Sequence, residues 1–312
     1  MDDLSDLIPR FDLRGMDLQL DRIHAALHEL DHPCRTIPAI QVLGTNGKGS
    51  IVSLLESALC AAGLRCGVTT SPHLVSWCER IRIKGKPIAI ETLRTQLQAL
   101  QALNERHRLT PFELLVTTAF LEFQRHACDL LVLEVGLGGR LDATTAHPYR
   151  PVVAVASIGL DHCEHLGNSL TAIATEKAAA IPPQATVISC VQAPEVRDVL
   201  KTTCRTQQAT LHWVKPLDST WQLGLPGAIQ RSNAAVALGA LQALSGLGWT
   251  LPEAVIQKGF ATAHWPGRLQ TVHWGDQKLR LDGAHNPPAA VQLAEERNQW
   301  ICLLYTSPSP RD

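Results

Sequence analysis

The chain has 312 residues, enough for one large domain or two ordinary ones, and its 45% hydrophobic content supplies a sizeable core. A net charge of −1 gives no electrostatic reason to expect binding to nucleic acid or to a membrane surface. No uninterrupted apolar run is long enough to span a bilayer, and the acidic first residues are unlike a signal peptide. Nine cysteines without a CxxC pair predict reduced thiols. We therefore expect a cytoplasmic monomer with small-molecule ligands.

Strand-like apolar runs alternate with helix-like amphipathic runs along most of the chain. The predicted strands are 40–43, 65–69, 130–135, 152–157, 186–190 and 210–214. The predicted helices are 17–30, 50–62, 90–105, 113–126, 170–181, 194–204, 232–244 and 252–261. Such alternation predicts an α/β fold with a mostly parallel sheet flanked by helices. Ligands then lie beyond the carboxyl ends of the strands.

The first predicted strand leads into the segment Gly44-Thr45-Asn46-Gly47-Lys48-Gly49-Ser50. Glycines let successive backbone N–H groups point at phosphate oxygens, and Lys48 adds a positive charge. Ser50 places a hydroxyl at a helix N-terminus, where anions are favoured and a phosphate-bound Mg²⁺ is within reach. The segment departs from the standard phosphate loop because Gly49 separates Lys48 from Ser50. A tight strand-to-helix turn is the alternative to this P-loop-type ATP site.

Glu134 ends the buried strand 130–135 and precedes a glycine-rich run. An ionised carboxylate in such a place is costly unless it is paired or bound to a metal. One interpretation is a buried ion pair with Arg140. The other is a Mg²⁺ ligand beside the phosphates, because Mg²⁺ takes few protein carboxylates and keeps several waters.

The segment Asp161-His162-Cys163-Glu164-His165 follows another strand end. Its HxxH spacing and its cysteine suggest a zinc site, but structural zinc needs three or four ligands and no further Cys or His cluster follows. A single His162 ligand to the nucleotide-associated metal is a second interpretation. A capping or hydrogen-bonding histidine is the third.

Four other positions have both an ordinary and a functional interpretation. Lys177 on a helix is by itself a solvated surface lysine, and Asn233 near a helix start is by default a cap. Arg268 is either a surface residue or a phosphate clamp, for which the planar guanidinium is suited. Asp282 follows a further predicted strand, again where ligands bind.

Three regions are expected along the chain: a nucleotide-binding domain over 1–265, a second α/β unit over 266–301, and a tail over 302–312. Strands 269–274 and 278–281 and a helix over 288–300 form the second unit, which is too short for an ordinary domain and is predicted to be truncated. The tail changes composition abruptly. It resembles the translation of a sequencing adapter and is predicted to be non-native.

The chain resembles the dihydrofolate synthase/folylpolyglutamate synthase enzymes, which are relatives of the bacterial Mur ligases. The resemblance covers about residues 4 to 300. The motifs that carry it are Gly44–Ser50, Ser71–Leu74, Glu79–Ile81, Glu134–Thr144, Leu160–His162, Glu176–Ala178, Pro266–Arg268 and Asp282–Pro287. The extra Gly49, odd for an ordinary phosphate loop, is normal in this family.

The resemblance implies a role for each matched residue. Nucleotide-binding residues are Thr45, Asn46, Gly47, Lys48, Gly49, Ser50, Asn233, Arg268 and Asp282. Mg²⁺ ligands are Ser71, Glu134 and His162. Substrate-binding residues are Arg10, Phe11, Asp12, Leu13, Thr110, Pro111, Phe112, Glu113, Leu141, Asp142 and Ala143. Catalytic residues are Lys48, Lys177, His162 and Arg268, with a carbamate on Lys177 that overturns its surface interpretation.

The implied activity is an ATP- and Mg²⁺-dependent amide ligase that joins L-glutamate to dihydropteroate, and to folates, through an acyl phosphate. Another Mur-type ligase and a nucleotide-binding fragment without turnover are the alternatives. The chain departs from the family at Thr145, where Asn is usual, and at Ala179, where Gly is common. The short second unit leads us to expect ATP-phosphate contacts without efficient ligation.

Overall fold

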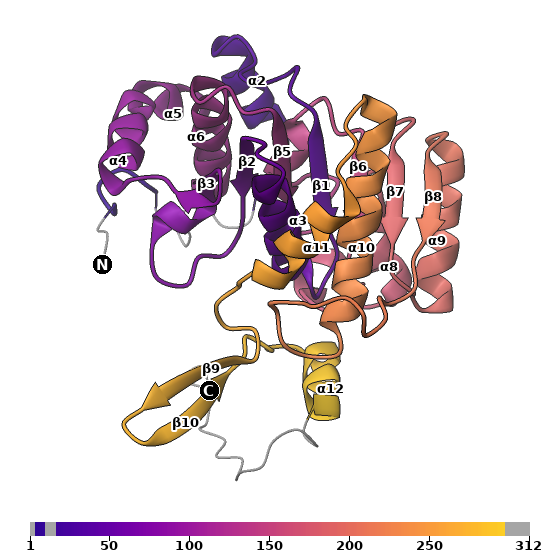
Figure 1. Cartoon of the computed structure of the whole chain (residues 1–312). Helices are drawn as coiled ribbons and strands as arrows, with labels where there is room; N and C mark the ends of the chain where they lie inside the picture. Colours follow the sequence, from indigo (N-terminus) through magenta and orange to yellow (C-terminus); the bar gives the residue numbers. More distant parts are fainter. Residues whose placement is uncertain (1–3, 10–16, 297–312) are drawn as a thin grey trace.

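The computed structural model describes residues 4–9 and 17–296. Four predicted substrate-binding residues, Arg10 to Leu13, and the predicted non-native tail lie outside the described residues. Helices cover both faces of one central sheet, and a smaller unit lies below it (Figure 1). Within the described ranges, no helix has the length and apolar character needed to cross a membrane.

The sheet has eight strands in the order β4-β3-β2-β5-β1-β6-β7-β8. The strands are β1 (Ala39–Leu43), β2 (Cys66–Thr69), β3 (Ile81–Ile83), β4 (Lys86–Pro87), β5 (Leu130–Glu134), β6 (Val152–Val155), β7 (Thr186–Ser189) and β8 (Thr210–Trp213). Neighbours from β2 to β8 pair in parallel, whereas β3 and β4 pair antiparallel. The predicted α/β class and mostly parallel sheet are confirmed.

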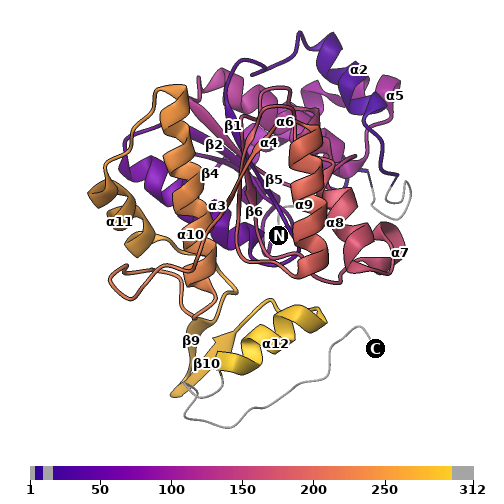
Figure 2. The same ribbon diagram turned by 90° about the vertical axis from the view of Figure 1, so that its right-hand side faces the viewer.

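The helices follow the strands as the sequence pattern predicts. They are α2 (Asp21–Glu29), α3 (Lys48–Ala61), α4 (Ile90–Ala99), α5 (Gln101–His107), α6 (Pro111–Arg125), α7 (Cys163–Leu166), α8 (Leu170–Ala178), α9 (Pro194–Thr206), α10 (Gln230–Ala243) and α11 (Glu253–Thr262). Short 3₁₀ turns are η1 (Trp77–Arg80), η2 (Ala143–Ala146) and η3 (Leu244–Leu247). Figure 2 shows α10 and α11 on one side of the sheet and α8 and α9 on the other.

The core is divided by the sheet into layers, and β6 shows why its strand is apolar throughout. Val152 and Ala154 pack with α3 and α10, whereas Val153 and Val155 face α8 and α9. A strand covered on both faces needs apolar side chains at every position. The continuous apolar runs in the sequence therefore identify the central strands.

One expectation about local structure is wrong, and one hairpin was not foreseen. The predicted helix 90–105 is two helices, because the chain bends at Leu100, whose N–H still bonds to carbonyls of the preceding turn. The hairpin β3–β4 was not predicted, since its strands are only three and two residues long. Its two-residue turn uses Lys84 and Gly85, both with positive φ, as type I′ turns require.

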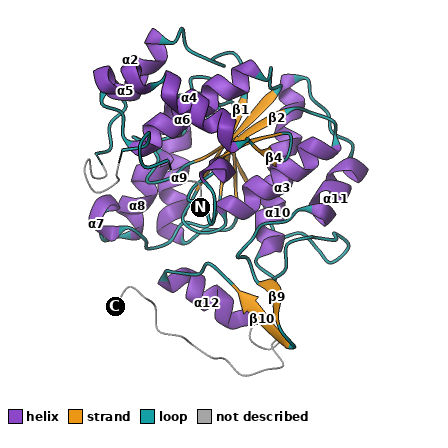
Figure 3. Cartoon of the chain, turned by 90° about the vertical axis from the view of Figure 1, so that its left-hand side faces the viewer, coloured by secondary structure: helices purple, strands orange, loops and turns teal. Residues whose placement is uncertain are grey.

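The smaller unit contains an antiparallel pair, β9 (Gln270–Trp274) and β10 (Gln277–Leu281), followed by α12 (Pro287–Glu295). Its strands form a sheet of their own, apart from the main sheet (Figure 3). Both predicted strands are confirmed. Asn286 caps α12 by accepting a hydrogen bond from the Ala289 N–H at 3.0 Å.

Candidate active site

The glycine loop connects β1 to α3 at the centre of the sheet, and its fold requires two glycines. Gly44 and Gly47 both have positive φ, at 139° and 97°. A Cβ on Gly44 would lie 2.7 Å from the Ala156 side chain. The N–H groups of Thr45 and Asn46 donate to the Ser157 carbonyl at 2.7 and 3.1 Å, which ties the loop to the end of β6.

The groups left for an anion are at the start of α3, which begins at Lys48, two residues before the predicted start. The first N–H groups of a helix have no intrahelical acceptor. The Ser50 hydroxyl is buried and has no hydrogen-bond partner within the described structure. Lys48 Nζ donates to the carbonyls of Gly44 and Thr45, each at 3.2 Å. These groups fit a phosphate and its associated cation.

The unusual Gly49 has a packing reason. A Cβ at this position would lie 2.8 Å from Nε1 of Trp265, which is tighter than real contacts allow. The Trp265 indole therefore lies directly on the first turn of α3. Glycine is required here by close packing, because α3 has ordinary helical geometry at this point.

Glu134 lies at the carboxyl end of β5 with its carboxylate fully buried. Burial raises the pKa of Glu134 to about 7, opposed by the nearby charge of Lys48 and a hydrogen bond from the Ser71 N–H at 3.3 Å. The alternative ion pair with Arg140 is wrong, because Arg140 pairs with Glu176 at 3.1 Å. A buried carboxylate with one hydrogen bond suits a cation.

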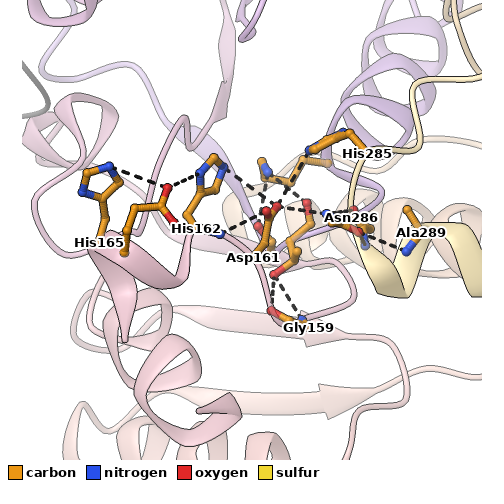
Figure 4. A network of polar contacts seen from close by, with 12 residues as sticks. Gly159, Asp161, His162, His165, His285, Asn286 and Ala289 are labelled. Atoms are coloured by element: carbon orange, nitrogen blue, oxygen red, sulfur yellow. Dashed lines mark hydrogen bonds and ion pairs between the residues drawn. The ribbon is translucent and has the colours of Figure 1, made fainter. Parts of the chain in front are cut away.

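His162 directly precedes α7 and has a φ of 48°, in the left-handed region. Its Nε2 lies 3.8 Å from Asp161 Oδ2, and His285 Nε2 reaches the same oxygen at 3.9 Å (Figure 4). Over the described ranges, no three His, Cys, Asp or Glu side chains cluster as a metal site. The geometry gives no support to zinc in this segment.

Lys177 on α8 is buried, so the surface interpretation is wrong. Its Nζ donates to the Gly44 carbonyl at 3.1 Å, the same oxygen that Lys48 contacts. Burial and, to a smaller extent, the neighbouring Lys48 charge lower the pKa of Lys177 to about 7. A neutral amine is therefore accessible near neutral pH.

Asn233 lies in the first turn of α10, three residues after its start, and does not cap the helix. It is buried and donates to Gln230 Oε1 at 2.9 Å. A Cβ on Gly47 would lie 2.4 Å from Asn233 Oδ1, so the loop and α10 are in close contact. Asn233 therefore lies against the phosphate loop.

The second unit meets the loop through Asn286, a residue that sequence reasoning missed. The amides of Asn46 and Asn286 exchange two hydrogen bonds, at 3.0 and 3.1 Å, and Asn286 also donates to Asp161 Oδ2 at 3.0 Å (Figure 4). Its position inside the Asp282–Pro287 motif was the available signal. Asp282 itself accepts hydrogen bonds from the N–H groups of Leu269 and Ala284.

Most of these residues line one cavity of about 180 Å³, called the nucleotide cavity below. Its walls include every predicted nucleotide-binding and metal-binding residue: Thr45, Asn46, Gly47, Lys48, Gly49, Ser50, Ser71, Glu134, His162, Asn233, Arg268 and Asp282. Lys177 does not line it. Its single hydrogen bond places it behind the loop, against Gly44.

A second cavity of about 290 Å³ has mainly apolar walls. It is lined by all the described residues predicted to bind substrate: Thr110, Pro111, Phe112, Glu113, Leu141, Asp142 and Ala143. Thr110 and Glu113 form a capping box at the start of α6. Asp142 accepts hydrogen bonds from the N–H groups of Gly136 and Leu137, so it shapes the loop after β5. Thr145, by contrast, bonds to the Gly139 carbonyl and Gln41 and does not line this cavity.

The two cavities meet along one edge formed by Ser71, Pro72, Gly136 and His162. A group at the end of a ligand in the apolar cavity is therefore brought to the phosphate loop. An α/β fold with a phosphate-type loop beside a largely apolar cavity is the arrangement expected of a nucleotide-binding enzyme with a second, mainly apolar substrate.

Comparison with known proteins gives this class a family. The chain is 35% identical to dihydrofolate synthetase of Saccharomyces cerevisiae over 313 residues, covering 90% of this chain and 72% of that protein. It is 35% identical to dihydrofolate synthase/folylpolyglutamate synthase of Escherichia coli over 296 residues, covering 90% of this chain and 68% of that one. No family model matches the chain.

Solved structures of the same family resemble the fold of this chain. An FPGS–AMPPCP–folate complex superposes with a TM-score of 0.88 at 28% identity, covering 96% of this chain and 80% of that one. E. coli FolC in complex with DHPP and ADP gives 0.81 at 30% identity, covering 96% and 73%. The chain belongs to the dihydrofolate synthase/folylpolyglutamate synthase family, whose members are ligases that form C–N bonds.

Proposed function

We propose that this protein joins L-glutamate to dihydropteroate, and to folates, with hydrolysis of ATP to ADP and phosphate. The observation that carries the proposal is the shared edge of the two cavities, at Ser71 and His162. A pterin-type acid bound in the apolar cavity would have its carboxyl end next to the phosphate loop. Membership of a family named for this reaction supports it.

The reaction has two steps that balance without a protein nucleophile. An oxygen of the pterin-linked carboxylate attacks the γ-phosphorus of ATP, and the bond to the ADP oxygen breaks. The glutamate amine then attacks the acyl carbon, a proton leaves the nitrogen, and phosphate departs with the bonding electrons. Positioning and charge neutralisation supply the catalysis in such phosphoryl transfers.

Nucleotide binding uses residues around the phosphate loop. The free N–H groups at the start of α3 and the Lys48 ammonium bind phosphates, and Asn233 contacts the adenine. Arg268 reaches the phosphates from the second unit. The N–H and hydroxyl of Thr45 are engaged with Ser157 and Gly159, so we assign Thr45 to holding the loop in place.

Mg²⁺ fits the donor set, because among the described residues the Ser50 hydroxyl is buried without a partner and the Glu134 carboxylate has one hydrogen bond. We propose that Ser71, Glu134 and His162 hold it, with Ser50 close by. When bound, the cation would neutralise charge that develops on the phosphates. Oxygen-rich ligation is typical of this ion.

Lys177 is proposed to react with CO₂ and lose a proton, which forms a carbamate. The reaction needs a neutral amine, and a pKa of about 7 for Lys177 supplies it. Carbamylation would convert a buried cation behind Gly44 into an anion. An anion there is suited to holding a second cation.

A third cavity of about 490 Å³ meets the nucleotide cavity at Ser71, Glu134 and Arg268. We propose that L-glutamate enters through it. Arg268 lines this cavity and supplies positive charge for a dicarboxylate, whereas Arg82, which also lines it, is paired with Glu56 at 2.9 Å. We further propose a monomer that works in the cytoplasm.

Phosphate release in the presence of ATP and Mg²⁺ tests the proposal. We expect phosphate release, slow as the short second unit predicts, only when dihydropteroate and glutamate are both added. Release that depends on a UDP-sugar peptide instead would reject the folate assignment. ATP binding with no turnover under any of these conditions would identify a nucleotide-binding protein.

A further inference from the structure

Arg80 ends the turn η1 and enters β3, the short strand that the sequence pattern missed. A capping box between Ser76 and Glu79 fixes the turn, and β3 pairs with β2. The Thr70 N–H donates to the Arg80 carbonyl at 3.2 Å. Arg80 is therefore held beside the carboxyl end of β2, next to the edge that both cavities share.

The Arg80 side chain is buried, with 8% of the residue exposed, and its orientation is fixed. Nε donates to His73 Nδ1 at 2.8 Å, and the guanidinium carbon lies 5.1 Å from the centre of the Trp77 ring. No carboxylate of the described residues lies within ion-pair distance of it. Burial without a paired anion is unfavourable for a charge, so the two terminal nitrogens are suited to an anion from a ligand.

Of the charged side chains that line the apolar cavity, Arg80 is the one suited to bind an anionic group of a ligand. Glu113 is paired with Arg22 at 3.1 Å, and Asp142 is bonded to backbone N–H groups. Among the described lining residues, Arg80 is the only lysine or arginine. It lines the apolar cavity and not the nucleotide cavity.

We infer that Arg80 binds the carboxylate of the pterin acid and aims it at the γ-phosphate of ATP. The inference rests on the proposed function. The planar guanidinium holds one carboxylate oxygen through its terminal nitrogens, which leaves the other oxygen to attack phosphorus. The held oxygen becomes the carbonyl oxygen of the acyl phosphate. Arg80 thereby distinguishes acids from pterins that lack a carboxylate.

Equilibrium binding to the 312-residue chain, with AMPPCP and Mg²⁺ present, tests this role. The probes are dihydropteroate and an analogue whose carboxyl group is replaced by methyl. We expect wild type to prefer dihydropteroate roughly 10- to 100-fold, as for one charge-assisted contact. Arg80→Met should lose that preference while its affinity for the methyl analogue stays unchanged. Arg125→Met, which removes an exposed guanidinium at the end of α6, should keep it.

Each outcome has one meaning. Undiminished preference in Arg80→Met overturns the inference, and so does equal wild-type affinity for the two probes. A loss of AMPPCP affinity alone would assign Arg80 to the nucleotide instead. If Arg80→Met does not fold, Arg80→Lys replaces it in the test, because lysine keeps the charge without the planar guanidinium. Its preference for dihydropteroate over the methyl analogue should be intermediate. A preference as large as that of wild type contradicts the inference. Failure of wild type to bind either probe would also reject the proposed function.

Discussion

At the scale of single residues, the site is marked by buried polar groups that the protein itself leaves incompletely satisfied. Within the part of the chain that the structure describes, the Ser50 hydroxyl has no hydrogen-bond partner, Glu134 has one hydrogen bond, and Lys177 is a buried amine. Each arrangement lowers the stability of the folded chain, because burying a polar group without a full set of partners is unfavourable. The same arrangement leaves these groups available to a ligand.

Lys177→Met separates stability from activity. We expect the rate of ligation to fall at least 100-fold, because no carbamate can form, and added bicarbonate should not restore it. The melting temperature in CO₂-free buffer at pH 6 should be equal or higher, since a buried charge is replaced by an apolar chain of similar length. Full activity of the variant would show that the carbamate role is wrong.

His147 gives a pH dependence away from the site. Burial lowers the pKa of His147 to about 4, below its ordinary value of 6.5. Between these values the unfolded chain binds a proton that the folded chain does not, so stability is lost as pH falls from about 6.5 toward 4. Urea unfolding should show ~2–3 kcal/mol of this loss at pH 4.5.

The matched variant for this measurement is His147→Gln, which cannot titrate but can still donate to the Ile37 carbonyl, as His147 Nε2 does at 2.8 Å. Its stability should fall less steeply over the same pH range. Equal slopes for the two proteins would assign the acid sensitivity to other groups.

At the scale of elements, the start of α3 is the functional end of a helix and is shaped by its neighbours. Trp265, far along the chain, packs on Gly49, and Asn233 from α10 lies against Gly47. The carbonyl of Ser157, after β6, accepts hydrogen bonds from the N–H groups of Thr45 and Asn46. The loop geometry is therefore determined by three separate segments and by its own glycines.

Gly49→Ala tests that packing. Alanine favours a helix by about 1 kcal/mol over glycine, but the added Cβ would lie 2.8 Å from the Trp265 indole. Overpacking of this kind costs roughly 1–3 kcal/mol, so we expect weaker AMPPCP binding, by about tenfold, and no gain in stability. Isothermal titration calorimetry measures the affinity.

The control is Gly246→Ala, because a Cβ there has no atom within 4 Å and φ is not positive. It should bind AMPPCP as wild type does. Tighter or unchanged binding by Gly49→Ala would show that the indole moves away without consequence.

At the scale of the whole molecule, the small unit meets the main domain at the phosphate loop. Asn286 contacts Asn46 and Asp161, and its neighbour Pro288 lies against Gly159. Glu296 at the end of α12 also accepts a hydrogen bond from the Ala228 N–H. These contacts hold Arg268 and His285 at the nucleotide cavity.

Asn286→Ala removes the paired amide and the cap of α12 together. We expect faster hydrogen exchange over residues 282–296 and AMPPCP binding weakened about five- to tenfold, as for two or three lost hydrogen bonds in a partly solvated interface. Asn168→Ala, at an exposed position, is the matched control. Unchanged exchange over 282–296 would show that other contacts alone hold the unit.

The sequence by itself determined the parallel sheet, the position of the glycine loop and most of the residues that line the nucleotide cavity. Strands buried on both faces must be apolar throughout, and a parallel sheet gathers its carboxyl ends at one edge, so local pattern carries this information. The family motifs identified Glu134, His162 and Arg268 without any knowledge of their surroundings.

Only the tertiary structure decided which of these polar groups have partners within the protein and which are available to bind a ligand. Arg140 pairs with Glu176, so it forms no ion pair with Glu134. Lys177 is buried and donates a hydrogen bond to the Gly44 carbonyl. Arg80 is held in place by β3, a strand too short to show a sequence pattern. Asn286 meets Asn46 across 240 residues. Burial, pKa and pairing depend on neighbours distant along the chain, and the order of residues does not specify them until the chain is folded.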